Sequence, residues 1–436
     1  MELDPTLLSR IQFAFVITFH ILFPSFTIGL ASFIAMLEGL WLFRKRQYYL
    51  YLSRFWTRIF AISFGMGVVS GVVMSYQFGT NWARFSAYAA NVMGPLLAYE
   101  VQMAFFLEAT FLGILLFARN RVPKPLVAFS ALMVALGTLI SAFWILSANS
   151  WMQTPDGYEI RDGMIHVTDW WRAIFNPSFP YRFAHMVIAC FVTTGFVVVA
   201  VNAWFLLRGR HRALARYTLS MTLWLLTLLV PLQIFLGDQH GLNTLEYQPS
   251  KVAAMEGHWE TEKGAPILLF AIPDQAKETN HYEIAIPKLG SLILTHSLDG
   301  KVPGLKDWPP QDRPHVATVF WSFRVMVGCG LLMLAIVVWS LLLRARRRLF
   351  DTPLFLRTCL LAGPIGFLAV IAGWFTTETG RQPWIIFNVM RTMDGASPGV
   401  PAGSVLLSLA LYAATYAIIF GAGVYFILQT VRQGPR

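Results

Sequence analysis

The chain has 436 residues, of which 56% are apolar and only 13% charged, and its mean hydropathy is +0.55. A soluble domain carries about 25% charged residues, so this composition excludes an ordinary soluble protein. The formal charge of +11 comes from 34 Lys and Arg against 23 Asp and Glu. In so apolar a chain, this excess more often reflects loops that orient helices than nucleic-acid binding. We therefore expect an all-α integral membrane protein that does not bind nucleic acid.

Nine apolar runs have the length that a membrane crossing requires, which is about 20 residues. They lie near 12–42, 56–78, 94–118, 125–150, 183–207, 218–236, 316–343, 355–376 and 404–431. The first run is too long for a removable signal peptide and has no small-residue cleavage site, so we expect it to be retained. These runs predict about nine transmembrane helices.

A polar stretch separates the sixth run from the seventh. It contains a helix-like part, SKVAAMEGHWETEKG, followed by the extended-looking parts ILLFAIP and YEIAIP. That is more order than a linker needs, although a plain cover over the helix ends is the simpler explanation. We divide the chain into helices 1–6 (residues 1–236), an extramembrane loop (237–315) and helices 7–9 (316–436).

Basic residues gather in the connections that follow the odd-numbered runs. They are Arg44, Lys45, Arg46, Arg54, Arg58, Arg119, Arg121, Lys124, Arg208, Arg210, Arg212, Arg216, Arg344, Arg346, Arg347 and Arg348. The opposite short connections hold isolated basic residues such as Arg84, Arg161 and Arg172. By the positive-inside rule, we expect the N-terminus and the loop 237–315 outside and the C-terminus in the cytoplasm.

Few ionisable side chains fall within the runs, and each is a functional candidate, because its insertion at a helix centre costs on the order of 2.5–3.5 kcal/mol. They are His20, Glu38, Glu100, Glu108, His185, Arg324 and Glu378. Taken alone, His20 could be hydrogen-bonded to a neighbouring helix or could be an axial haem ligand. His185 and Met326 lie in helices that both run inward from the outer face, and a His/Met pair is a ligand set of electron-transfer haems. Arg324 would then bind the haem propionates, although Met326 by itself could be a packing residue.

Three carboxyl groups in the runs suggest proton transfer or iron binding. Glu100 and Glu108 are eight residues apart, which on a regular α-helix separates them by about 80° in azimuth and roughly 12 Å along the axis. Two protonatable groups staggered in this way suit a proton relay, and Glu100 could also be an iron ligand. The simpler explanation is that both make polar contacts between helices. Glu378 ends the eighth run beside Arg381 and Trp384, where an interfacial ion pair is the simpler explanation.

The number of histidines within the runs helps to choose among haem proteins. A haem-copper oxidase needs about six for its haems and copper, whereas only His20 and His185 lie within these runs. That family is therefore disfavoured. Two competing functions stay open: a secondary transporter whose intramembrane Glu and Arg bind substrate, and a quinone-linked cytochrome b that does not react with O2.

Through nearly its whole length, the chain resembles subunit I of the cytochrome bd quinol oxidases. The matching segments are SRIQFAFVITFHILFPSFTIG, YQFGTNWARFSAYAANVMGPLLAYEVQMAFFLEATFLG (with Tyr76 at its start), ALGTLISAFWILSANSWMQTP, RFAHMV, FRVMVGCG and GWFTTETGRQPW. The resemblance implies an enzyme of the bacterial inner membrane that oxidises quinol at the outer face. It would reduce O2 to water with cytoplasmic protons and so build a proton motive force without pumping.

The resemblance also implies the haem set. His185 and Met326 would hold a low-spin haem b, with Arg324 near its propionates. The full set would be two haem b and one haem d, or haem b in place of haem d. The identity of the third haem stays open because the N-terminal half looks closer to the cyanide-insensitive branch, and the outer loop is of the short form.

Two high-spin haems are implied in addition. His20, with Glu100 opposite it, would serve one of them and Glu378 the other, and the resemblance leaves open which haem each serves. Trp374 and Arg381, in the segment of Glu378, would contribute to cofactor binding.

Proton and quinol residues follow from the same resemblance. Glu108 and Ser141 would carry protons from the cytoplasm to the oxygen site. In the outer loop, Lys251 and Glu256 match positions implicated in quinol oxidation, and Asp238 is a weaker candidate. The implied partners are a second large membrane subunit, a one-helix accessory subunit as a further candidate, quinol (expected to be ubiquinol), O2 and membrane lipid.

Overall fold

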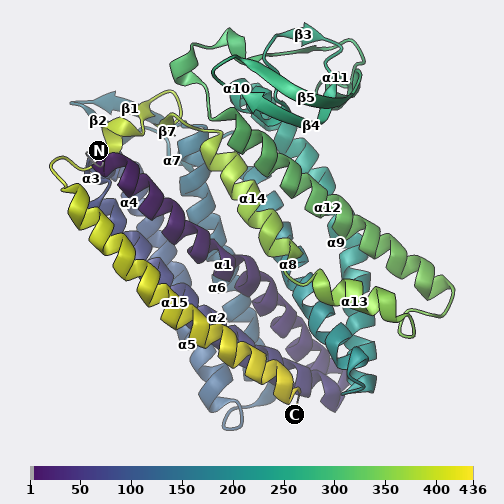
Figure 1. Ribbon diagram of the computed structural model, residues 1–436. Coiled ribbons are helices and arrows are strands. Elements are labelled where there is room, and N and C mark those ends of the chain that lie inside the picture. Colours follow the sequence, from purple (N-terminus) through teal and green to yellow (C-terminus); the bar gives the residue numbers. More distant parts are fainter. Residues whose placement is uncertain (1–3, 436) are drawn as a thin grey trace.

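The computed structural model describes residues 4–435 and, within them, nine helical spans that are long and apolar enough to cross a membrane. The spans are α1 (Pro5–Arg44), α2 (Gln47–Thr80), a third span from Ala90 to Ala118, α6 (Lys124–Gln153), α8 (Phe179–Leu207), α9 (Arg212–Tyr247), α12 (Val316–Ala345), an eighth span from Pro353 to Thr379 and α15 (Ala402–Gln433). They lie side by side in one elongated bundle (Figure 1). The expected all-helical membrane fold is confirmed.

The third span is not a regular α-helix. It consists of α4 (Ala90–Tyr99), the π-helix η1 (Glu100–Phe105), α5 (Phe106–Gly113) and the π-helix η2 (Ile114–Ala118). A π-helix bonds i to i+5 and is therefore wider than an α-helix, and it occurs frequently at functional sites. The azimuth of about 80° expected between Glu100 and Glu108 assumed a regular helix, so it does not apply here.

The eighth span is also interrupted. It divides into α13 (Pro353–Leu361) and α14 (Ile365–Thr379), with Pro364 between them. Proline has no amide hydrogen to donate and disfavours the helical conformation in the residue before it.

The sixth span continues beyond residue 236, where the sequence placed its end. The helix α9 runs to Tyr247, so residues 237–247 extend a helix instead of beginning a loop. The remaining segment, 248–315, is called the cap. It contains α10 (Pro249–Glu256) and an antiparallel hairpin of β4 (Ile267–Asp274) and β5 (Thr279–Ile286), which confirms the expected helical and extended parts.

Short elements complete the cap and the other connections. Those of the cap are β3 (Glu262–Lys263), α11 (Leu289–Thr295), β6 (Lys301–Val302), η3 (Leu305–Asp307) and η4 (Pro310–Asp312). Those elsewhere are α3 (Ala83–Tyr88), β1 (Tyr158–Arg161), β2 (Met164–Val167), α7 (Trp170–Ile174), β7 (Trp384–Ile386), β8 (Met390–Arg391) and η5 (Met393–Gly395). Strand β3 pairs with β6, β1 with β2 and β7 with β8, each antiparallel.

The two ends of the bundle differ in character. The cap, the β1–β2 hairpin and the start of α1 lie at one end, here called the cap end (Figure 1). The C-terminal end of α15 and the arginine-rich connections lie at the other, here called the basic end.

The core lies where α1 packs against α2, α6 and α8. At one point α1 and α8 approach backbone to backbone. A Cβ on Gly29 would lie 2.6 Å from the carbonyl oxygen of Cys190, and Thr194 Oγ1 donates to the carbonyl of Phe26 at 2.8 Å. Small residues at such crossings let membrane helices pack closely. This close packing fixes α1 and α8, which carry His20 and His185.

Candidate functional site

His20 of α1 is held by α2. Its Nδ1 lies 2.9 Å from Ser70 Oγ, and that hydroxyl donates its hydrogen to the carbonyl of Gly67 at 2.9 Å. Serine has one hydroxyl hydrogen, so a Ser70 that donates to Gly67 accepts from His20, which fits an imidazole protonated on Nδ1. The lone pair of Nε2 is then available, as in a metal-bound histidine whose other nitrogen is oriented by a hydrogen bond. Of the two interpretations of His20, this geometry favours the iron ligand.

His185 of α8 faces α9. Gln233 Nε2 lies 3.2 Å from His185 Nδ1, and the ring of His240 approaches edge-on with a centroid distance of 5.6 Å. A Cβ on Gly237 would lie 3.1 Å from His185 Cε1, so this position has little room for a side chain. His240 Nε2 is buried without a hydrogen-bond partner among residues 4–435. The imidazole of His185 is thus enclosed mainly by α9.

Met326 of α12 points toward α14. A Cβ on Gly373 would lie only 2.9 Å from the Met326 sulfur, and the hydroxyls of Ser322 and Thr376 join the same two helices at 2.9 Å. Met326 and His185 come from different helices, α12 and α8. The predicted ligand pair is therefore supported by the setting of each residue and stays a prediction.

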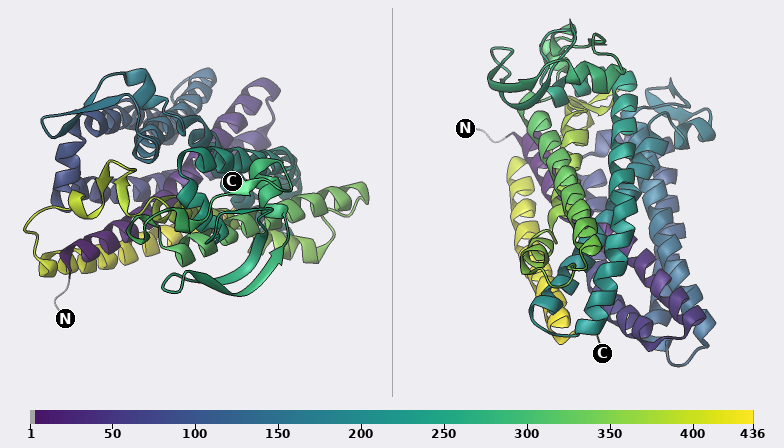
Figure 2. Two further views of the ribbon diagram at one scale, coloured as in Figure 1. Left: turned by 90° about the horizontal axis from the view of Figure 1, so that it is seen from above. Right: turned by 90° about the vertical axis from the view of Figure 1, so that its right-hand side faces the viewer.

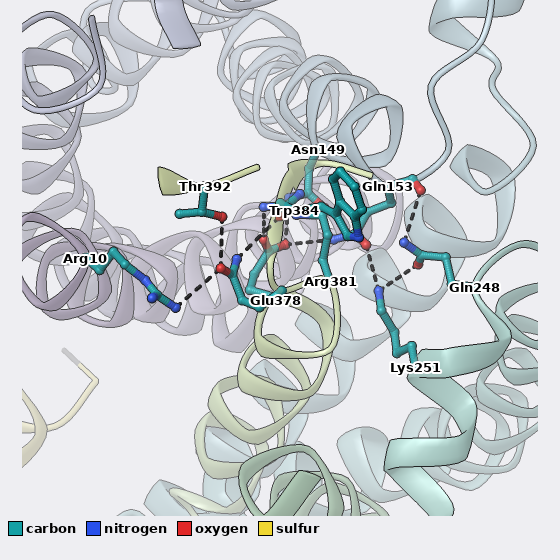
Figure 3. A network of polar contacts seen from close by, with 10 residues as sticks. Arg10, Asn149, Gln153, Gln248, Lys251, Glu378, Arg381, Trp384 and Thr392 are labelled. Atoms are coloured by element: carbon teal, nitrogen blue, oxygen red, sulfur yellow. Dashed lines mark hydrogen bonds and ion pairs between the residues drawn. The ribbon is translucent and has the colours of Figure 1, made fainter. Parts of the chain in front are cut away.

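Glu378, at the end of α14, is the centre of a buried polar network (Figure 3). Its Oε2 forms an ion pair with Arg381 Nη2 at 2.5 Å, and its Oε1 accepts from Asn149 at 2.9 Å and from Gln153 at 3.2 Å. The carboxylate thus links the eighth span to the fourth. This is more than the exposed interfacial pair that the sequence offered as the simpler explanation, since the Arg381 side chain is only 6% exposed.

Lys251 of α10 joins the network from the cap (Figure 3). Its Nζ donates to Gln153 Oε1 at 2.6 Å and to Gln248 Oε1 at 2.7 Å. Gln153 therefore bridges Lys251 and Glu378. Burial lowers the pKa of Lys251 well below its usual value, and the nearby Arg182 guanidinium lowers it further.

This network holds more positive than negative charge. Arg182 and Arg381 are both buried beside Glu378, which influences each of them, and the amine of Lys251 lies next to all three. Arg381 Nε and Nη1 are buried with no hydrogen-bond partner in the described range. Buried cations need anionic partners, and a guanidinium suits carboxylates. The site therefore fits an anionic group such as a haem propionate.

Arg324 makes its polar contacts with the cap. Its Nε and Nη2 donate to the carbonyl of Leu268 at 2.9 and 2.7 Å, its Nη1 donates to the carbonyl of Met255, and Nη2 lies 3.2 Å from Glu256 Oε2. The guanidinium is thus largely occupied by the cap. Because Arg381 keeps two donor atoms without a partner among residues 4–435, Arg381 is the better candidate for binding a propionate.

The two carboxylates of the third span face the same side of α6. Ser141 Oγ donates to Glu100 Oε1 at 2.6 Å. A Cβ on Gly137 would lie 2.7 Å from Glu108 Cγ, so Glu108 packs directly against that glycine. Gly137 and Ser141 are one turn apart, or about 6 Å along the helix. The structure therefore brings Glu100, Glu108 and Ser141 together as the proposed relay requires.

Two further candidates lie outside these groups. Glu38, fully buried near the basic end, forms an ion pair with Arg119 at 2.5 Å and accepts a short hydrogen bond from Ser53. Asp238 lies exposed on the extension of α9, beside Gln239 at 3.3 Å. Glu38 is thus explained by a structural ion pair, and Asp238 gains no support as a quinol residue.

Trp374 lines a cleft of about 210 Å³ between α1 and α14. The cleft is also lined by Glu378, Arg381 and Arg10, and Arg10 Nη2 donates to Gln382 at 3.3 Å (Figure 3). Most other lining residues are apolar, as in cofactor sites generally. The polar partners Asn149, Gln153, Gln248, Arg182 and Arg10 were missed from the sequence, although Asn149 and Gln153 are polar residues at the end of an apolar run.

Comparison with known proteins agrees with this arrangement. The model of the family described as cytochrome bd terminal oxidase subunit I matches residues 8–435. The chain belongs to this family. The resemblance seen in the sequence is thereby confirmed, and the protein is a multi-pass membrane protein with haem as the implied cofactor.

Named relatives cover nearly the whole chain. It is similar to the cytochrome bd-II ubiquinol oxidase subunit 1 of Escherichia coli (strain K12), with 34% identity over 98% of this chain and 96% of the relative. It is also similar to the cytochrome bd ubiquinol oxidase subunit 1 of Bacillus subtilis (strain 168), with 35% identity over 98% and 93%. The solved bd oxidase of Geobacillus thermodenitrificans superposes with a TM-score of 0.92 and 32% identity over 99% of both chains.

Proposed function

We propose that this chain is the haem-bearing catalytic subunit of a quinol:oxygen oxidoreductase of the cytochrome bd type. The observation that carries the proposal is the buried network in which Glu378, Arg381 and Lys251 are joined through Gln153. It combines an excess of buried cations, as propionate binding requires, with a lysine supplied by the cap. Family membership agrees with this assignment.

The proposed haem ligands are those expected from the sequence. His185 and Met326 would hold a low-spin haem b, and His20 and Glu378 would each serve one of two high-spin haems, with Glu100 opposite His20. The third haem is d, or b in its place. When bound, the haems supply electron transfer and an iron at which O2 is reduced to water.

Several features of the chain fit such groups. A His20 imidazole protonated on Nδ1 leaves Nε2 free, and Arg381 has two buried nitrogen atoms without partners among residues 4–435. Within residues 4–435, no three or more His, Cys, Asp and Glu side chains come together in a group that could hold a metal ion without a macrocycle. This donor set suits iron that is carried in a macrocycle and needs one or two axial ligands.

Quinol oxidation is assigned to the cap end. Burial favours the neutral amine of Lys251, which can then accept a proton from a quinol hydroxyl. Glu256, held by Arg324 at 3.2 Å, is a second proton acceptor on the same short helix. The charge bias of the connections supports an outside position for this end, so quinol protons would be released outside.

Protons for water formation would come from the opposite, cytoplasmic side. Glu108 and Glu100 both lie against α6, with Ser141 bonded to Glu100. These groups can pass protons from the basic end toward the oxygen site. Charge separation then follows from the positions of the two reactions, and no pump is required.

A second large subunit is the proposed partner, and the third span offers a face for it. Val101, Met103 and Phe106 are 53%, 50% and 63% exposed, and the polar Gln102 is exposed between them. A polar side chain facing lipid is costly, so a protein partner over this face is the more stable arrangement. The proposed setting is a bacterial inner membrane, with ubiquinol as substrate and a one-helix accessory subunit as a further partner.

The test uses the purified complex made with ample haem supply. We expect haem bands in a reduced-minus-oxidised spectrum, b and d (or b alone) by pyridine haemochrome analysis, and O2 consumption driven by quinol. A colourless protein would contradict the proposal and favour a transporter. A coloured protein that takes electrons from quinol without consuming O2 would instead be a cytochrome b. The variant His185→Ala should lose the low-spin signal and keep the others.

A further inference from the structure

The β4–β5 hairpin carries an apolar surface that is left open. This surface, here called the hairpin face, consists of Phe270, Ile272, Ile284 and Ile286, which are 38%, 46%, 59% and 42% exposed. Phe270 pairs with Ile284 across the strands. Paired residues lie on the same face, and Ile286 is two residues from Ile284, so Phe270, Ile284 and Ile286 share one side. Ile272 is separated from Phe270 by the buried Ala271 and is open on that side as well.

The other side of the hairpin is packed inside the protein. Leu268 and Ala271 of β4 form a small core with Phe320 of α12. The pairing register shifts between Leu268 and Phe270, and such an irregularity lets Leu268 face the packed side although Phe270 does not. A hairpin that is buried on one side usually presents polar residues on the other, so an open apolar surface there indicates a binding surface.

The hairpin face continues onto the surface of α12. The ring of Phe270 contacts the edge of Trp321 with a centroid distance of 5.1 Å. Trp321 is exposed, and farther along α12 so are Val325 and Leu332, at 40% and 51%. Tryptophan is enriched where a membrane helix leaves the hydrocarbon region. The hairpin face therefore begins at the level where lipid headgroups meet acyl chains.

The position of the hairpin agrees with this level. It lies just beyond the end of α12 in Figure 1, and from above it reaches the periphery of the molecule in Figure 2. Lys277, in the turn between the strands, has a side chain that is 71% exposed. Its long side chain lies 3.8 Å from Asp274 and can also reach lipid phosphates at the headgroup level beside the apolar surface.

We propose that the hairpin face binds the lipid bilayer itself, resting at the headgroup boundary beside α12. The membrane contact would then be connected, through hydrogen bonds, to Glu256 of the proposed quinol residues. The carbonyl of Leu268 accepts two hydrogen bonds from Arg324, and Arg324 also contacts Glu256. A quinol that diffuses within the bilayer would meet the cap at this attachment. That consequence rests on the proposed function, whereas the membrane contact does not.

The contact is tested by fluorescence quenching in liposomes that contain the complete complex. An environment-sensitive fluorophore is attached through Ile284→Cys and, as matched control, through Glu283→Cys. The Glu283 side chain accepts from Asn280 at 2.9 Å, on the packed side of the hairpin. The native cysteines Cys190, Cys329 and Cys359 are buried. Haem spectra of both variants serve to check that the complex is intact. If the Ile284→Cys complex does not assemble, Ile286→Cys takes its place.

We expect a nitroxide on the upper acyl chain to quench the label at position 284 several-fold more strongly than the label at 283. A water-soluble quencher should show the opposite order. Equal quenching by the lipid nitroxide at both positions would overturn the proposal. Protection of position 284 from both quenchers would also overturn it, because a protein partner would then cover the hairpin face. Neither outcome depends on whether the complex oxidises quinol.

Discussion

The substitution Gly373→Ala tests whether Met326 is an iron ligand. The added methyl would lie 2.9 Å from the Met326 sulfur, whereas ordinary contacts begin near 3.4 Å, so the sulfur must move by about 0.5 Å. Metal–ligand distances tolerate changes of only about 0.2 Å. The variant should therefore weaken or lose methionine coordination, although the fold itself is destabilised by no more than about 1–3 kcal/mol.

The assay is a reduced-minus-oxidised spectrum combined with a redox titration. Methionine ligation raises the haem potential, so we expect the low-spin signal to diminish and its potential to fall. The matched control is Gly328→Ala on α12, where an added methyl would have no neighbour within 4 Å among the described residues. A Gly373→Ala complex that keeps both the low-spin signal and its potential would refute the assignment of Met326.

Three other substitutions test the remaining parts of the site. Ser70→Ala removes the acceptor for His20 Nδ1, and since loss of such a partner lowers metal affinity by about 10–100-fold, haem per polypeptide should fall in a haemochrome assay. Lys251→Met removes an amine whose pKa is lowered in the folded protein. Just below the usual lysine pKa, the unfolded wild-type chain therefore binds one proton more than the folded chain does. Wild-type stability should therefore rise relative to the variant as pH increases toward that usual value, as measured by unfolding temperature. Arg119→Leu leaves buried Glu38 without its ion-pair partner and should destabilise the protein by roughly 3–5 kcal/mol, whereas adding Glu38→Leu should recover part of the loss.

Each of these variants has a matched control. Ser75→Ala, on the same helix as Ser70, removes an exposed hydroxyl bonded to Val72 and should keep full haem content. Lys277→Met removes an exposed lysine and should show no comparable pH trend, and Arg58→Leu removes an exposed arginine of α2 with an effect within about 0.5 kcal/mol. Reduced haem in the Ser75 variant, or a Lys251 variant with the same pH profile as wild type, would contradict the reasoning.

The transmembrane spans and the regular secondary structure of the cap could be predicted from the sequence because both depend on local properties. About 20 apolar residues are needed to cross a membrane, and nine such runs are visible by composition alone. The strands β4 and β5 were visible as apolar, β-branched segments. The intramembrane histidines and carboxylates were visible because they are costly in lipid.

Other features depend on contacts between distant segments and could not be predicted. A π-helix such as η1 leaves little trace in composition. The helix α9 continues through polar residues that distant segments hold, as where Asn243 donates to the carbonyl of Pro177. The partners of Arg324 lie in the cap, at 255, 256 and 268, and nothing local to its helix indicates them. The same holds for Gln153, whose importance comes from standing between Glu378 and Lys251.

The excess charge in the buried network makes one last prediction about assembly. Arg182 and Arg381 lie beside Glu378, and two nitrogen atoms of Arg381 have no partner within residues 4–435. Buried cations without anionic partners destabilise a protein, and a ligand that binds only the folded state stabilises it. Haem binding should therefore stabilise the cap end in particular, because Lys251 of the cap is joined to this network through Gln153. Limited proteolysis should cleave the cap faster in protein made under haem limitation than in haem-replete protein, with the connections of the basic end cleaved equally in both. Equal cleavage of the cap in the two preparations would show that the network is stable without its anionic partner.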